Sequence, residues 1–207
     1  MARDSNRLRF MRCLAVTAVA AMNIGAPAPA LSARDGDAVL LVAKRQFLHP
    51  LYGASIVLAK PIGNRQHIGF ILNKPTSMKL RDALPADEPS PKVPLYLGGP
   101  VDVNTIFALV HRSDSPGHDS IEFADDLYLA TDPSTVQSIV AAAPEEARLF
   151  FGAVLWRPGE LEAELNRGLW HVRAPEADMV LRKDTAGLWE ELVRRSEQEA
   201  YFRSHGI

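Results

Sequence analysis

The sequence predicts one α+β domain over residues 34–207, preceded by an N-terminal leader. Short runs rich in Val, Ile and Leu, separated by Gly, Pro and Asn, indicate several strands. Fewer segments carry the caps and periodicity of helices. The chain has 207 residues, of which 47% are apolar and 23% charged, and this composition is typical of a folded domain rather than a disordered chain.

The first 33 residues are typical of a secretory signal peptide. Arginines precede a short apolar run, Cys13–Met22, and small residues follow it. The run is about half the roughly 20 residues that a membrane-spanning helix needs, so we expect no permanent membrane anchor. Cleavage after Ala30 or Ala33 would give a periplasmic or secreted protein. A misassigned start codon is the alternative, and it would leave the protein in the cytoplasm.

Removal of the leader makes the chain more acidic. The formal charge of the whole chain is −2, and loss of residues 1–33 leaves 19 basic and 24 acidic residues, a net charge of −5. The one cysteine, Cys13, is lost as well, which excludes disulfides and thiol catalysis in the remaining domain. An acidic domain without a basic run repels phosphate, so we expect no nucleic-acid partner.

The apolar runs are largely continuous, which predicts strands covered on both faces. Polar segments at Pro85–Pro94 and Arg112–Glu122 are predicted as exposed loops. The predicted strands are Val39–Lys44, Ser55–Lys60, His67–Asn73, Pro94–Gly99, Thr105–His111, Leu127–Ala130, Ala147–Leu155 and Trp170–Arg173.

Helix positions follow from caps and from apolar spacing. Asp132 followed by Pro133 is a typical helix start, and Gly168 is suited to a helix end. In the last helix, apolar residues share one stripe and charged residues surround it. The predicted helices are Ser134–Ala143, Glu160–Arg167, Ala186–Phe202 and, with a weaker pattern, Met78–Leu84.

Four segments, in this order, resemble the AlgH/YqgE family. They are IGFILNKP at Ile68–Pro75, LGGPV at Leu97–Val101, RLFFGAVLWRPGELE at Arg148–Glu162 and GLW at Gly168–Trp170, and the resemblance covers roughly residues 36–195. The resemblance implies a single compact domain with a mixed, barrel-like β-sheet flanked by helices. The family is uncharacterised and is sometimes labelled a transcriptional regulator, and a secretion signal is unusual in it.

Two of these segments are turns with two possible roles. Asn73, Lys74 and Pro75 end a strand, and Asn and Pro are typical of a structural turn. Alternatively, the Asn73 amide and Lys74 face an anionic ligand. Gly98, Gly99 and Pro100 permit a sharp change of chain direction, or else present successive N–H groups to an anion.

The third segment joins a strand to a helix. Trp156, Arg157, Gly159 and Glu160 lie at this junction, where free N–H groups and Arg157 would hold an anion. Glu160 competes with such an anion for the positive end of the helix, which favours a capping role. Glu160 and Glu164 lie one turn apart, and a hydrolase that pairs one of them with a histidine is a weaker hypothesis.

Motifs for chemistry are absent from the sequence. It has no nucleophile elbow, phosphate-binding loop or repeated histidine spacing, so we expect no catalytic residue, cofactor or metal. We therefore predict an exported, non-enzymatic binding or interaction domain whose contact surface consists of the three junctions above. An unknown protein or a small anionic ligand would be its partner. The alternatives are a transcriptional regulator, for which Arg194 and Arg195 are the nearest basic pair, and the hydrolase.

Overall fold

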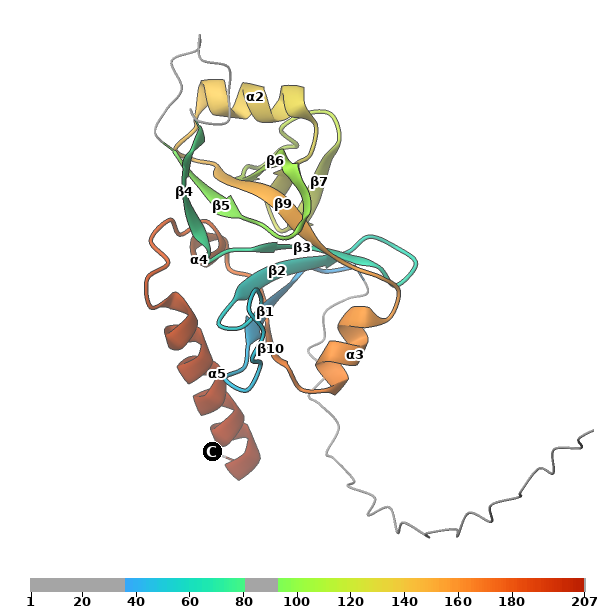
Figure 1. Cartoon of the computed structure of the whole chain (residues 1–207), viewed down its shortest axis with the longest axis vertical. Helices are drawn as coiled ribbons and strands as arrows, with labels where there is room; N and C mark the ends of the chain where they lie inside the picture. Colours follow the sequence, from blue (N-terminus) through green and yellow to red (C-terminus); the bar gives the residue numbers. More distant parts are fainter. Residues whose placement is uncertain (1–35, 81–92, 207) are drawn as a thin grey trace, which may run out of the picture.

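Residues 36–80 and 93–206 are described by the structure, a computed structural model, and they form a curled sheet with helices outside it (Figure 1). The predicted leader, and residues 81–84 of the predicted weak helix, lie outside the described residues. The strands are β1 (Val39–Ala43), β2 (Ile56–Pro61), β3 (His67–Ile71), β4 (Pro75–Lys79), β5 (Pro94–Leu97), β6 (Val101–His111), β7 (Ser120–Ala124), β8 (Leu127–Ala130), β9 (Arg148–Trp156) and β10 (Trp170–Arg173). The helices are α2 (Pro133–Ala142), α3 (Glu160–Asn166), α4 (Ala177–Val180) and α5 (Leu188–His205).

The expectation of an α+β domain with a mixed, barrel-like sheet is confirmed. Neighbouring strands follow the order β10-β1-β2-β3-β9-β6-β8-β7, and β5 pairs with both β4 and β9. All pairs are antiparallel except β5 with β9. The sheet curls into a half-barrel, and β9 passes through both its lower and its upper part (Figure 1). This strand therefore joins the two parts of the sheet.

Some elements differ from the predictions. Met78 and Lys79, predicted to begin a helix, belong to strand β4, because Lys79 pairs with Pro94 of β5. The end of the predicted loop Arg112–Glu122 forms the start of β7, which pairs with β8. Helix α4 was not predicted, since four residues carry too little periodicity to mark a helix. Tertiary pairing overrides local preference in the two strands.

Strands at the centre of the sheet are buried on both faces, as predicted. In β1, Leu40 and Val42 face one core cluster, whereas Leu41 and Ala43 face another. All four side chains are fully buried. Alternation along a strand therefore places apolar side chains into two separate cores.

Helices cover the cores with the predicted faces, and α2 lies over a third cluster. Asp132 caps α2 by accepting a hydrogen bond from the backbone N–H of Thr135 at 2.9 Å. On α2, Val136, Ile139 and Val140 are buried against the sheet, as the spacing predicted. On α5, the buried residues Leu188, Leu192, Val193 and Ser196 all lie in the first half of the helix, and its second half extends beyond the sheet (Figure 1).

Arg148, the first residue of β9, is a buried cation at 1% exposure. Its guanidinium donates hydrogen bonds to the backbone carbonyls of Val180, at 2.8 Å, and of Arg182 and Leu72. It also lies 4.2 Å from the centroid of the Tyr96 ring. Burial lowers the pKa of Arg148 to about 10, so the group stays charged at neutral pH. Arg148 thus ties the chain around α4 to the sheet without a carboxylate partner in the described part of the chain.

Candidate functional site

Asn73 has a structural role in the turn after β3. Its Oδ1 accepts a hydrogen bond from the backbone N–H of Ile56 at 2.8 Å, and its Nδ2 donates to the carbonyl of Ala54 at 2.8 Å. The carbonyl of Lys74 accepts from the N–H of Leu97 at 2.9 Å. Both polar atoms of the Asn73 side chain therefore bind the neighbouring turn, and this geometry does not turn the amide toward a ligand.

Gly98 and Gly99 allow their turn to come close to the backbone of strand β9. A methyl group on Gly98 would overlap the carbonyl oxygen of Gly152, and one on Gly99 would overlap that of Ala153. The N–H of Gly98 donates to the carbonyl of Phe151 at 2.9 Å, so it is already used inside the protein. The glycines therefore serve close packing, and exposed Pro100 is the part of this turn that reaches the surface.

Glu160 caps the start of α3, in agreement with the capping role that the sequence favoured. Its Oε2 accepts a hydrogen bond from the backbone N–H of Arg157 at 2.8 Å. Gly159, at the N-cap, has a φ of +83°, a conformation that suits glycine. This tight junction turns the chain from β9 into α3 and fixes the helix beside the end of the strand.

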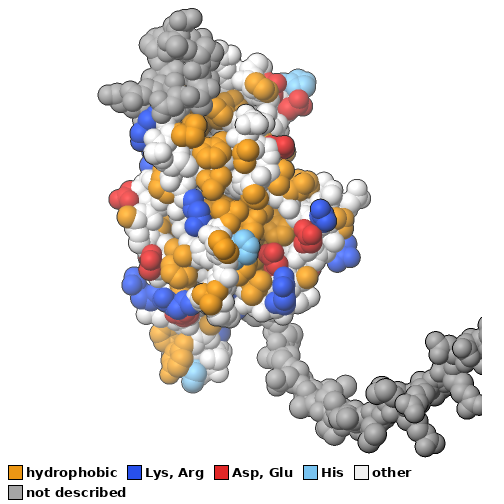
Figure 2. Space-filling view, in the orientation of Figure 1, with side chains coloured by type: hydrophobic (Ala, Val, Ile, Leu, Met, Phe, Trp, Pro, Cys, Tyr) orange, Lys and Arg blue, Asp and Glu red, His pale blue; other side chains and the backbone are white. Residues whose placement is uncertain are grey.

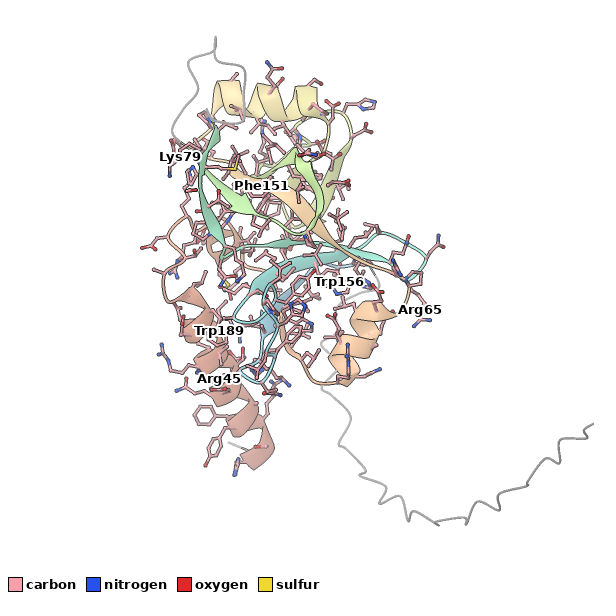
Figure 3. The ribbon with its side chains drawn as sticks, viewed as in Figure 1. Arg45, Arg65, Lys79, Phe151, Trp156 and Trp189 are labelled. Carbon is pink, nitrogen blue, oxygen red and sulfur yellow. The ribbon has the colours of Figure 1, made fainter. Side chains whose placement is uncertain are left out.

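A recess of about 330 Å³ lies between this helix and the end of β9. Glu164 is half-buried in its wall, and its Oε2 accepts hydrogen bonds from the indole N–H groups of Trp156, at 3.2 Å, and Trp170, at 2.8 Å. Trp156 lies where β9 meets α3 (Figure 3). The residues that line the recess are Tyr52, Val154, Leu155, Trp156, Glu160, Ala163, Glu164 and Arg167.

Tyr52 reaches the recess from a compact aromatic loop between β1 and β2. Its ring stacks on His49 with centroids 4.8 Å apart, and His49 Nδ1 accepts the backbone N–H of Tyr52 at 3.2 Å. Phe47 packs edge-on against Trp170 at 5.1 Å and thus links the loop to the second indole. Tyr52 was not among the predicted site residues, because only folding brings this loop to α3.

The recess has a negative electrostatic character. Burial raises the pKa of Tyr52, and the charges of Glu164 and Glu160 raise it further. Within the described residues, neither glutamate forms an ion pair. Arg167 lies at the rim, where its Nε donates to the carbonyl of Ala163 at 3.3 Å. The recess is therefore suited to a group that brings positive charge or hydrogen-bond donors.

Glu160 and Glu164 do not meet a histidine, the arrangement that the hydrolase hypothesis requires. Their hydrogen bonds go to a backbone N–H and to indoles. His67 instead lies near Glu162 on the same helix, and burial lowers its pKa while Glu162 opposes that shift. Glu162 itself forms an ion pair with Arg65 at 3.4 Å. The geometry therefore assigns the two recess carboxylates no proton-transfer partner among the described residues.

A larger hollow of about 800 Å³ opens where β1 begins and where β2, β7 and β10 end. Two cations in its wall already bind groups of the protein, although Nε of Arg173 is buried without a hydrogen-bond partner. Lys60 Nζ donates to the carbonyls of Gly36, at 3.0 Å, and Phe123, at 3.3 Å. Arg173 binds both carboxylate oxygens of Glu199, at 2.9 and 3.0 Å. The smaller recess is the better candidate site, because two indole N–H groups hold its Glu164 carboxylate, whereas Arg173 of the larger hollow is paired with Glu199.

The recess opens beside an apolar surface. Hydrophobic side chains form a band down the face shown in Figure 2, from the region of Phe151 to that of Trp156 (Figure 3). Leu155 on β9 has 44% exposure, and Val101, which pairs with Ala153 of the same strand, has 36%. Of the predicted contact residues, the structure thus brings Pro100 and the Trp156–Glu160 junction toward one strand, β9.

In residues 36–80 and 93–206, no cluster of three or more His, Cys, Asp or Glu side chains has the geometry to hold a metal ion. None of the helices in these ranges is long and apolar enough to cross a membrane.

Comparison with known proteins identifies the family. A family model described as AlgH-like matches residues 40–201. A UPF0301 protein of Chlorobaculum tepidum is 29% identical over 158 residues, which cover 75% of this chain and 83% of the relative. One from Parabacteroides distasonis is 28% identical over 157 residues, covering 74% of this chain and 79% of its own.

Solved structures support the same fold. The solution structure of AlgH from Pseudomonas aeruginosa matches with a TM-score of 0.58 at 22% identity, covering 82% of this chain and 88% of that one. A crystal structure from Corynebacterium diphtheriae matches with a TM-score of 0.65 at 21% identity, covering 78% and 87%. The resemblance seen in the sequence motifs is thus confirmed, and the chain belongs to the AlgH-like family.

Proposed function

We propose that this AlgH-like chain is a non-enzymatic binding domain whose contact surface is the recess beside α3 together with the apolar band along β9. The observation that carries the proposal is the pair of hydrogen bonds by which two indoles hold Oε2 of Glu164. They fix the carboxylate in the wall of a recess, and a fixed carboxylate recognises a ligand by geometry and charge. Proton transfer would instead need a partner group of suitable pKa within reach.

A protein is the partner that suits this surface better than a small anion. Glu160 and Glu164 place negative charge in the recess, and Glu160 already occupies the N–H of Arg157 that an anion would use. Leu155 and Val101, exposed beside it, offer apolar area that a protein surface would cover. We therefore propose a protein partner that presents an apolar patch next to a hydrogen-bond donor or a positive group.

Crosslinking in living cells tests this surface. The full chain with a C-terminal tag is expressed in its own host, crosslinked and recovered, and captured proteins are compared between wild type, Leu155→Glu and Tyr201→Glu. Tyr201 is the matched control, because it is an exposed apolar residue on the far half of α5 with 57% exposure. We expect a partner that wild type and the control retain and that Leu155→Glu loses. Equal capture by all three proteins would contradict the proposed surface.

We also propose that the domain acts after export to the periplasm. The arginine-led leader over residues 1–33 and the lack of cysteine in residues 34–207 support this location. Mass spectrometry of the protein from a periplasmic extract should find a mature N-terminus at Leu31 or Arg34. An intact Met1 on soluble protein in the cytoplasm would refute export and would favour the regulatory alternative.

The regulatory alternative predicts binding to DNA. Its basic pair, Arg194 and Arg195, lies exposed on α5, where Glu190, Glu191 and Glu197 are neighbours in the sequence. Acidic neighbours weaken attraction to phosphate, so we expect no retardation in a gel shift at low salt. A shifted band that disappears as salt is raised would support the regulator instead.

A further inference from the structure

We infer that the recess beside α3 is a binding site for an ammonium group carried on an alkyl stem; this inference rests on the proposed binding function. The charged head would lie against Glu164 and Glu160, and the stem along Val154 and Ala163. Such a group is present in small amines and in the lysine side chains of proteins. The two sources share the chemistry that the recess would recognise.

Glu164 supplies the charge that an ammonium group needs. Both hydrogen bonds to its Oε2 come from indole N–H groups, which are neutral donors, so they orient the carboxylate without cancelling its charge. No cation of the described chain forms an ion pair with it. A partly buried charge without a counter-ion is costly, and a bound cation would reduce that cost. A charge-assisted hydrogen bond to the carboxylate would add to the gain.

The walls suit an alkyl stem and a cationic head. Val154 and Ala163 are apolar, and Tyr52 lines the same recess. Alkyl stems of long amines pack along apolar side chains while the charged end reaches a polar group. An aromatic ring near the head attracts a cation further. The volume, about 330 Å³, lies at the lower end of the range for small-molecule sites, which fits a single side chain or a short amine.

Arg167 lies at the rim of the recess and should lower its affinity for an ammonium group. Its exposed positive charge repels an approaching ammonium group, although solvent weakens the repulsion. Arg167→Gln should therefore strengthen ammonium binding by about twofold to threefold, whereas Glu164→Gln should weaken it. An anionic ligand would show the reverse order. The two variants together report the sign of the ligand's charge.

The test is a titration followed by NMR, with the indole N–H resonances of Trp156 and Trp170 as reporters of the recess. The probes are pentylammonium, neutral 1-pentanol of similar shape, and Nα-acetyl-lysine methylamide. We expect saturable shifts of both indole resonances with pentylammonium and none with 1-pentanol. Tighter binding of the lysine derivative would identify a protein lysine as the source, and equal or weaker binding would identify a small amine.

Variants decide whether the binding depends on the recess. Glu164→Gln, whose amide oxygen can still accept the indole hydrogen bonds, should lower affinity by about tenfold or more. Glu162→Gln is the matched control, because Glu162 lies on the same helix, pairs with Arg65 and does not line the recess. Should Glu164→Gln fail to fold, Tyr52→Leu must show reduced affinity instead. The inference is overturned if Glu164→Gln, or Tyr52→Leu where it replaces that variant, binds as tightly as wild type, or if neither amine binds.

The two proposals fail in different ways. If no amine binds but Leu155→Glu still abolishes capture of a protein partner, the ammonium site is refuted and the binding surface stands. If an amine binds in the recess but capture is equal in Leu155→Glu and wild type, the ammonium site stands and the protein-binding surface is refuted.

Discussion

Replacement of Arg148 by methionine tests the argument that a buried cation holds the chain around α4 to the sheet. Methionine is of comparable length and fills the space with apolar atoms, but it cannot donate to the carbonyls of Leu72, Val180 and Arg182. Each unsatisfied buried carbonyl costs about 1 kcal/mol or more, which gives about 3 kcal/mol for the three groups. Removal of a charge that is costly to bury offsets part of any larger loss.

Urea unfolding followed by circular dichroism measures the change in the free energy of unfolding. Arg182→Met is the control, because the Arg182 side chain is 49% exposed and its ion pair with Glu191, at 3.3 Å, is a surface one. Such a pair contributes about 0.5 kcal/mol or less, so the control should be nearly as stable as wild type. Amide exchange should also speed up in α4 in the Arg148 variant. A loss below about 1 kcal/mol, or a gain in stability, would refute the role of the three hydrogen bonds.

Three further predictions concern stability. Gly98→Ala should lower the free energy of unfolding by about 3 kcal/mol, because the methyl group overlaps the backbone of Gly152. Gly63→Asn, where nothing lies within 4 Å of the added Cβ, should cost about 1 kcal/mol or less, and equal losses for the two variants in urea unfolding would contradict the packing argument. Tyr96→Phe should lower the free energy of unfolding by about 1 kcal/mol in the same assay, because the Tyr96 hydroxyl donates a hydrogen bond to the carbonyl of Lys183 at 2.6 Å. An unchanged urea midpoint would show that water replaces this hydrogen bond. Burial and the charge of Lys44 lower the pKa of His171 in the folded protein. As the pH falls toward about 6.5, the unfolded chain therefore binds this proton more readily than the folded one, and wild type should lose stability between pH 7.5 and 5.5. His171→Gln should lose less stability over this range, and identical pH dependence of the two proteins would exclude this histidine as a cause.

The strands and capped helices were predictable where sequence signals are local. Asp132 caps a helix through its own backbone neighbours, and the two-sided burial of β1 follows from its continuous apolar run. Strand β4 was missed because its residues are all exposed or half-buried, without an apolar run or a regular alternation, and only pairing with β5 makes it a strand. The same limit applies to Arg148, whose burial depends on carbonyls from two distant segments.

The candidate site was predictable in part. Trp156 and Glu160 were singled out because a strand-to-helix junction is visible in the sequence, and the capping role of Glu160 follows from its position. Tyr52 is far from them in the sequence and reaches the recess through a loop whose shape depends on His49 and Phe47. The sharing of one Glu164 oxygen by two indoles depends on three separate elements, β9, α3 and β10, and no spacing rule predicts it.

The position of β9 in the sheet has a consequence for synthesis of the chain. Strands β1, β2 and β3 pair in sequence order, and β8 pairs with both β6 and β7, but β3 and β6 are neighbours only by way of β9. While the ribosome has yet to release residue 156, the facing edges of β3 and β6 therefore expose unpaired N–H and C=O groups, which invite aggregation. A nascent chain held in that state would depend on a chaperone, or on passage across a membrane while still unfolded, to keep the two halves apart until the joining strand arrives.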